Sequence, residues 1–212
     1  MTYDYGQWWL VALNIFLFGY FIKEAFKPQN KIDWRSFQMI MAFIVALFAE
    51  MYGFPLTVFL LTSYFGSRFD FSHNKGHLLN TLLGQNGDPH FGFLHIISYL
   101  LIIGGIILIS KAWKVLYEAA KENVLATTGP YAYLRHPQYL GFILIILGFL
   151  LQWPTIITLL MAPILIGRYL WLAGKEETEM DAKYHQEYQK YRVETPGFYP
   201  SWRKVFERVK LK

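Results

Sequence analysis

TTGPYAYLRHPQYLG, residues 127–141, is a polar and aromatic stretch between two long apolar runs. Pro137 suits the first turn of a helix, because the N–H group that proline lacks would have no partner there. His136 then lies near the N-terminal cap of the apolar run 138–151. At such a helix N-terminus the backbone N–H groups, the helix dipole and the Arg135 guanidinium favour a bound carboxylate or phosphate. The alternative is that Arg135 and His136 only anchor a membrane span at the lipid headgroups.

Composition places the chain in the membrane class. Of its 212 residues 54% are hydrophobic and 19% aromatic, whereas only 17% are charged, as is typical of a chain with several apolar spans. Cysteine is absent, which excludes disulfides, thiolate metal sites and thiol nucleophiles. The net charge of +5 does not indicate nucleic-acid binding, because the basic residues cluster just outside apolar runs, where they would meet anionic lipid.

Five apolar runs predict an all-α fold, a polytopic membrane helix bundle with about five transmembrane helices. The expected spans are residues 8–25, 37–62, 91–113, 138–151 and 155–173. The first lacks a basic leader and a cleavage site, so we expect it to be retained. The second exceeds the ~20 residues that a bilayer core needs and should tilt or kink near Gly53 and Pro55. The short connection 152–154 predicts that the fourth and fifth spans form a tight antiparallel hairpin.

Basic residues predict the orientation of the spans. They are frequent after the first and third expected spans and in the C-terminal tail, whereas segment 63–90 carries only Arg68 and Lys75. By the positive-inside rule we expect the N-terminus outside. Segment 127–141 and the tail should then share the cytoplasmic face, and a site built from them should open to the cytoplasm.

Glu50 lies inside the second expected span. A carboxylate at membrane depth is costly unless it is paired or protonated, so it should face the protein interior or a wet cavity. Two interpretations stay open. Glu50 contacts substrate or handles a proton, or it is a paired or protonated structural residue.

Segment 63–90 is polar and carries His73, His77 and His90. These positions do not form a compact ligand motif, so the sequence predicts no metal site. We expect a re-entrant or surface loop that covers the bundle. His95, near the start of the third span, is expected to be a buried, hydrogen-bonded histidine.

Beyond the fifth span the chain is expected to continue as a helix into water. Glu177, Tyr184, Tyr188 and Tyr191 recur at helical spacing on one face. Glu176 and Glu177 stand where this helix leaves the bilayer, and they are either a solvated surface or one wall of a pocket opposite segment 127–141. A pocket with donors on one wall and carboxylates on the other suits a zwitterionic or cationic ligand.

Four features follow one another in the chain: ENVLATTGPYAYLRHPQYLG, a helical hairpin, the EE pair and YQKYRVETPGFYP. In this order they resemble the superfamily of integral-membrane isoprenylcysteine carboxyl methyltransferases and phospholipid N-methyltransferases. The resemblance covers about residues 121–200. It implies S-adenosylmethionine as the cofactor and a lipid or other lipophilic small molecule as the methyl acceptor. The cofactor-binding residues that it implies are Asn123, Val124, Leu125, Ala126, Tyr131, His136, Pro137, Gln138, Tyr139 and Glu176. We add Glu177, because it would stand on the same wall of the predicted pocket. Tyr131 and Tyr139 could contact the adenine or face the sulfonium.

One position departs from the family pattern. In the prenylcysteine enzymes an arginine thought to hold the substrate carboxylate lies one helical turn before the glutamate that matches Glu176, and here that position is Leu172. Arg168, one turn deeper, is a substrate-side candidate together with Glu50, or it is a snorkelling or paired structural arginine. No catalytic base is assigned, because methyl transfer from a sulfonium depends on positioning more than on an acid or base.

Two other functions stay open. A membrane NADPH-dependent sterol or enone reductase can carry a similar arginine-histidine-proline motif, although such relatives often have a glutamate where this chain has Phe142, and more spans. A membrane scaffold or transporter is the non-enzymatic alternative. We expect one membrane domain, with spans one to three in residues 1–120, the cofactor-binding core in 121–200 and an amphipathic interfacial tail in 201–212. The expected partners are the lipid bilayer and the lipophilic acceptor, and no nucleic acid or protein partner is inferred.

Overall fold

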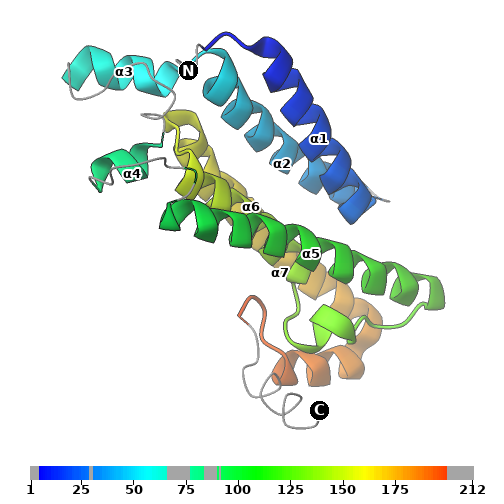
Figure 1. Ribbon diagram of the computed structural model, residues 1–212. Helices are drawn as coiled ribbons and strands as arrows, with labels where there is room; N and C mark the ends of the chain where they lie inside the picture. Colours follow the sequence, from blue (N-terminus) through cyan, green and yellow to red (C-terminus); the bar gives the residue numbers. More distant parts are fainter. Residues whose placement is uncertain (1–4, 29–30, 66–76, 84–89, 91, 200–212) are drawn as a thin grey trace.

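The computed structural model describes residues 5–28, 31–65, 77–83, 90 and 92–199. Within these residues helices are the only regular secondary structure, and they form an elongated bundle (Figure 1). The predicted all-α bundle is therefore confirmed. The expected amphipathic tail 201–212 and most of segment 63–90, His73 included, lie outside the described residues.

Five main helices build the bundle. They are α1 (Trp8–Phe26), α2 (Lys31–Phe48), α5 (Phe93–Glu122), α6 (Pro137–Gln152) and α7 (Ile156–Glu194). Four helical stretches are long and apolar enough to cross a membrane, whereas α6 has 16 residues and is shorter. This agrees with the apolar runs, which predict about five spans with a short fourth one.

The second apolar run is interrupted, as predicted. After α2 a π-helical segment, η1 (Ala49–Gly53), precedes the short helix α3 (Leu56–Phe65), which points away from the axis of α2 in Figure 1. Phe54 is extended, with φ −106° and ψ 110°, because the following proline disfavours the helical conformation there. The Glu50 carboxylate accepts a hydrogen bond from the Thr57 N–H at 2.8 Å, so it caps the helix that follows the kink.

Helices α5 and α6 lie antiparallel in close contact. A Cβ atom on Gly105 would lie 2.6 Å from the Gly141 carbonyl oxygen, and one on Gly148 would lie 3.0 Å from the Ser98 carbonyl oxygen. Small residues at these positions let the two backbones approach. A Cβ atom on the neighbouring Gly104 would meet nothing within 4 Å, so only Gly105 of these two glycines lies at the close contact.

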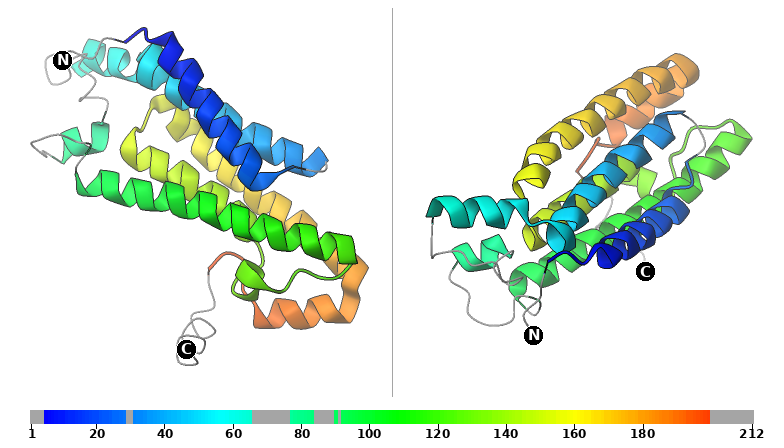
Figure 2. Two further views of the ribbon diagram at one scale, coloured as in Figure 1. Left: turned by 45° about the vertical axis from the view of Figure 1, so that its right-hand side comes forward. Right: turned by 90° about the horizontal axis from the view of Figure 1, so that it is seen from above.

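Helix α7 begins at a capping box and then breaks. Thr155 Oγ1 accepts a hydrogen bond from Thr158 N at 3.1 Å, and Thr158 Oγ1 accepts one from Thr155 N at 3.0 Å, which satisfies two N–H groups of the first turn. His185, with φ 43° and ψ −113°, is not helical. Figure 2 shows the orange C-terminal part of α7 running across the axis of its first part. The expected continuous helix through residues 184–191 is therefore wrong, because the chain folds back at His185.

Candidate functional site

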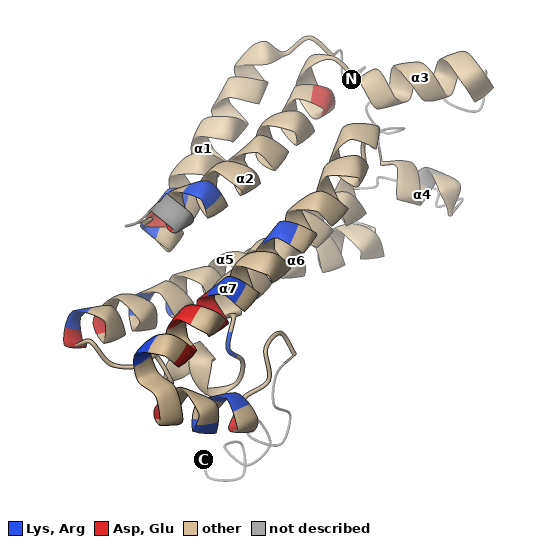
Figure 3. Ribbon diagram, turned by 180° about the vertical axis from the view of Figure 1, so that it is seen from behind, with Lys and Arg blue, Asp and Glu red and all other residues tan. Residues whose placement is uncertain are grey.

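A cavity of about 290 Å³ lies where α5 ends and α6 begins. Its walls come from α2, the last turns of α5, segment 124–138 and both parts of α7. Most of the ribbon positions that Figure 3 colours as Lys, Arg, Asp or Glu lie toward this end of the bundle. The volume is near the lower limit of ordinary ligand sites, which span ~300–1,000 Å³.

Segment 124–138 is held against α5 by its backbone. Asn123 ends α5 in the left-handed conformation, with φ 54° and ψ 37°, and its N–H donates to carbonyls of the last helical turn. Gly129 has φ +57°, and a Cβ there would lie 2.9 Å from Val115 Cγ2; glycine meets both requirements. A 3-10 turn, η5 (Gly129–Ala132), follows. Pro137 then opens α6 at its first position, with His136 as the N-cap residue, as predicted.

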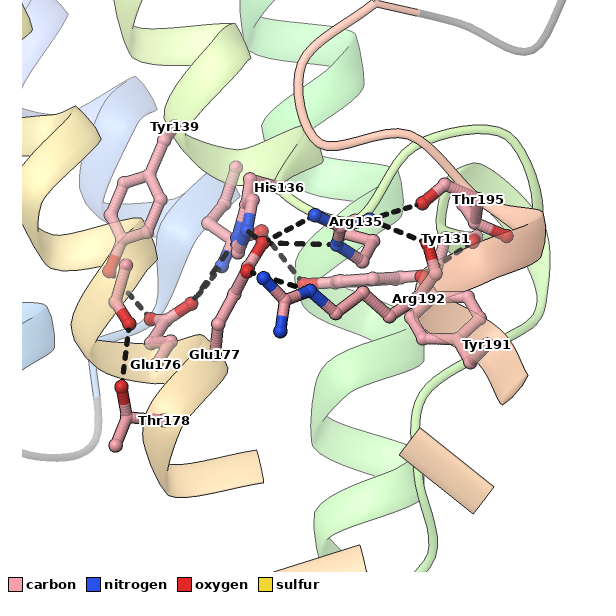
Figure 4. Close-up of polar contacts among 12 residues, drawn as sticks. Tyr131, Arg135, His136, Tyr139, Glu176, Glu177, Thr178, Tyr191, Arg192 and Thr195 are labelled. Atoms are coloured by element: carbon pink, nitrogen blue, oxygen red, sulfur yellow. Dashed lines mark hydrogen bonds and ion pairs between the residues drawn. The ribbon is translucent and has the colours of Figure 1, made fainter. Parts of the chain in front are cut away.

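Glu177 joins this segment to α7 (Figure 4). Its Oε1 atom accepts hydrogen bonds from Arg135 Nε at 3.0 Å and Nη2 at 2.7 Å, and it lies 2.9 Å from His136 Nε2. Arg135 Nη1 donates to the carbonyl oxygens of Arg192 at 3.0 Å and Thr195 at 2.5 Å. One guanidinium therefore connects segment 124–138 to both parts of α7.

The backbone reinforces this connection. Arg135 N donates to the Pro196 carbonyl oxygen at 2.9 Å, and His136 N donates to the Gly197 carbonyl oxygen at 3.1 Å. The Phe198 ring lies 5.3 Å from the His136 ring. These donors of Arg135 and His136 therefore pair with Glu177 and with the chain that follows α7, and the two interpretations of this helix N-terminus, an anion site or a membrane anchor, stay predictions.

Glu176 is held by a second set of contacts. Its Oε1 accepts from the Tyr139 hydroxyl at 2.5 Å, and its Oε2 accepts from Gln138 Nε2 at 3.1 Å. Gln138 Oε1 accepts in turn from the Tyr131 hydroxyl at 2.9 Å. The Glu176 side chain keeps 28% of its surface exposed and lines the cavity, so its carboxylate is positioned and still accessible.

Burial and charge set the protonation states of this end of the bundle, which lies outside the spanning part of α7 expected to end at residue 173. Burial by itself raises the pKa of the Glu177 carboxyl, but hydrogen bonds from His136 and Arg135 and their charges outweigh it, so the pKa lies below its ordinary value. Burial, then the charge of Glu176, raises the pKa of the Tyr131 hydroxyl well above its usual range. Glu177 is therefore a carboxylate and Tyr131 a neutral donor at neutral pH.

Comparison with known families covers the same part of the chain. Residues 93–187 match the phospholipid methyltransferase family. The matched segment runs from α5 into the C-terminal part of α7 and contains all the predicted cofactor-binding residues. The match confirms the predicted superfamily resemblance and supports a membrane methyltransferase. No curated protein and no solved structure matches the chain.

Most of the predicted cofactor residues line the cavity. They are Val124, Leu125, Ala126, Tyr131, His136, Gln138, Glu176 and Glu177. The other three are not among its lining residues. Asn123 ends α5 and Pro137 begins α6. Tyr139 is only 2% exposed and holds Glu176, so its contact is with that carboxylate.

The two substrate-side candidates do not line the cavity. Arg168 is exposed on α7, with its guanidinium 4.6 Å from the centre of the Trp171 ring. Glu50 caps α3 through Thr57, whose hydroxyl accepts from Ile156 N at 2.8 Å at the start of α7. Ile156 is about 30 Å from Glu176 along the helix, at ~1.5 Å per residue. A substrate-side role for either residue stays a prediction.

The sequence did not point to several residues that line the cavity. Asp33, in the first turn of α2, is buried and lines the cavity with Trp113 of α5. Trp113 Nε1 donates to the Lys27 carbonyl oxygen at 2.9 Å, which ties α5 to the connection between α1 and α2. The sequence could have pointed to Asp33, because it is an acidic residue in a short connection on the expected cytoplasmic face.

Proposed function

We propose that the protein is an integral-membrane, S-adenosylmethionine-dependent methyltransferase that acts on a lipid or other lipophilic small molecule. The observation that carries the proposal is the accessible Glu176 carboxylate beside His136 in the cavity of the methyltransferase domain. His136 Nδ1 is buried, has no hydrogen-bond partner among the described residues and lies 3.8 Å from Glu176 Oε2. A polar group of a ligand in the cavity would supply the missing partner.

The lining fits this cofactor chemically. S-adenosylmethionine, when bound, supplies an activated methyl group on a sulfonium. Glu176 offers carboxylate oxygens to an ammonium or to ribose hydroxyls, and Tyr139 and Gln138 fix their position. The aromatic rings of Tyr131 and Tyr188 also line the cavity, and a cation facing such a ring gains ~0.5–2 kcal/mol.

The chain contributes positioning and exclusion of water. In-line orientation of two reactants can lower a barrier by ~7–11 kcal/mol without an acid or base. The fold-back of α7 supports this role, because Tyr191 donates to the Tyr131 carbonyl oxygen at 2.7 Å and closes one side of the cavity. We propose that the acceptor arrives laterally from the bilayer, whereas the cofactor enters from the cytoplasmic side.

Ligand binding tests the proposal against its alternatives. Calorimetry on purified protein in detergent should show binding of S-adenosylmethionine and of its demethylated product, and weaker or no binding of NADPH. Binding of NADPH alone would favour a reductase. The absence of any thermal shift with either nucleotide would favour a scaffold or transporter.

Isotope labelling identifies the acceptor. Cells with and without the protein are fed methionine with a labelled methyl group, and their lipids are compared by mass spectrometry. A labelled lipophilic product that depends on the protein, and that the variant Glu176→Gln makes more slowly, is the expected result.

A further inference from the structure

Three histidines meet at the end of the bundle opposite the cavity. His77 directly precedes α4 (Leu78–Leu82), and His95 lies in the first turn of α5. With His90 they place one ring nitrogen each within 4.8 Å of one another. His95 is about 40 Å from the last residue of α5 at ~1.5 Å per residue, so this cluster is separate from the methyltransferase site.

The cluster is packed rather than loosely gathered. The His77 ring centre lies 4.9 Å from that of His90 and 4.9 Å from that of His95. The Trp153 ring lies 4.8 Å from His77. His77 and His95 are 3% and 1% exposed, whereas His90 is exposed. Two imidazoles are therefore fixed in the interior, and the third can adjust at the surface.

Gln152, the last residue of α6, orients the two buried rings. His77 Nδ1 donates to the Gln152 carbonyl oxygen at 2.9 Å. Because a carbonyl only accepts, this bond places the proton on Nδ1, and in the neutral ring Nε2 carries the lone pair. Such a bond to a backbone carbonyl is the usual second contact of a metal-binding histidine.

The Gln152 amide provides the corresponding contact for His95. The amide nitrogen lies 2.7 Å from His95 Nε2, and the amide oxygen accepts from Ser98 Oγ at 3.2 Å. Turning the amide exchanges its nitrogen and oxygen at almost the same positions. In that orientation His95 Nε2 donates to the amide oxygen, Ser98 Oγ accepts from the amide nitrogen, and His95 Nδ1 carries the lone pair.

We propose that His77, His90 and His95 bind a first-row transition metal ion, best suited to Zn²⁺, with Gln152 positioning two of the ligands. Imidazole suits zinc and its neighbours, and within the part of the chain that the structure describes the cluster contains no carboxylate for Ca²⁺ or Mg²⁺. Three histidines with a fourth position for water form a known type of zinc coordination. A tetrahedral ion with bonds of ~2.0–2.1 Å needs nitrogens about 3.4 Å apart, so the three rings, whose nitrogens lie within 4.8 Å of one another, must move closer together when the ion binds.

Cobalt and zinc binding test this site directly. Full-length protein in detergent, carrying no polyhistidine tag, is stripped with a chelator and titrated with Co²⁺. We expect one Co²⁺ per chain, the visible absorption of a tetrahedral nitrogen site, and displacement by Zn²⁺. Failure of the stripped protein to bind either ion at one per chain would overturn the proposal. This readout is independent of methyl transfer.

Variants locate the ion. His77→Gln and His95→Gln should abolish the Co²⁺ spectrum, and His90→Gln should weaken Co²⁺ affinity at least tenfold. His185→Gly removes a histidine outside the cluster and should leave binding unchanged. If the buried variants do not fold, the exposed His90 decides. Unchanged Co²⁺ affinity in His90→Gln would show that the histidines form only a hydrogen-bonded cluster. A loss of affinity in His185→Gly equal to that in His90→Gln would show that the ion is adventitious.

Discussion

Glu176 and Glu177 are neighbours in the sequence but have different partners. Glu177 holds Arg135 and His136 and so connects segment 124–138 to α7. Glu176 is held by Tyr139 and Gln138 and keeps part of its carboxylate accessible in the cavity. We infer that Glu177 maintains the shape of the site, whereas Glu176 contacts the ligand.

Substitution of Glu176 tests this division. Glu176→Gln should weaken S-adenosylmethionine binding roughly tenfold, about 1.4 kcal/mol, because a charge-assisted hydrogen bond becomes a neutral one. Calorimetry on folded protein measures the dissociation constant. Glu187→Gln, an exposed position on the same helix, is the matched control and should bind normally. Equal affinities for both variants would exclude Glu176 as a cofactor contact.

Acid should weaken the Glu177 contacts. The pKa of this carboxyl is lowered in the folded protein, so its stabilising contribution is complete above the ordinary value of about 4.3 and is lost as the pH falls through the folded pKa. Thermal unfolding between neutral pH and about pH 3 should show a steeper decline for the natural protein than for Glu177→Gln. Parallel declines would mean that Glu177 does not contribute.

At the scale of elements, the α5–α6 contact depends on individual glycines. Gly105→Ala would place a methyl group 2.6 Å from the Gly141 carbonyl oxygen, so we expect a loss of ~1–3 kcal/mol in stability from overpacking. Gly104→Ala meets nothing within 4 Å and should be neutral or slightly stabilising. Thermal unfolding of the two variants in the same detergent compares them, and similar melting temperatures would contradict this packing.

The break in α7 offers a second test at this scale. His185 has φ 43° and ψ −113°, a conformation that glycine adopts easily and that costs other residues ~1–3 kcal/mol. His185→Gly should therefore preserve or raise stability, whereas His185→Val should lower both stability and S-adenosylmethionine affinity by straining the fold-back. Hydrogen exchange across residues 185–194 measures how far each substitution alters the local stability of the folded-back segment. A valine variant with unaltered exchange would show that the break has little effect on the site.

At the scale of the whole molecule, the candidate site in the cavity and the histidine cluster lie at opposite ends of one bundle. If the helices span the bilayer as expected, the two sites face opposite sides. Topology reporters placed after Lys212 and within residues 66–76 should then report opposite sides, with the C-terminus in the cytoplasm. Signals from the same side would contradict the five-span arrangement.

The sequence by itself determined the features that depend on local chemistry. Five apolar runs, most of them about as long as a bilayer core is thick, predicted the bundle, Pro55 predicted the kink after α2, and Pro137 marked the start of α6. These predictions succeed because the length of an apolar run and the missing N–H of proline are local properties of the sequence. Most of the cofactor residues that the motif predicted line the cavity, because segment 124–138 and the glutamate pair each occupy a short stretch of the chain.

Only the tertiary structure decided which of these groups meet. The pairing of Arg135 with Glu177 spans 42 residues, and the contact of His77 with Gln152 spans 75. Helical periodicity carries no information about such distant partners, and it missed the break in α7 at His185, beyond which the chain folds back and contacts segment 124–138. The histidine cluster was missed for the same physical reason, because His77 and His90 meet His95 of α5 by tertiary packing and not by spacing along one helix.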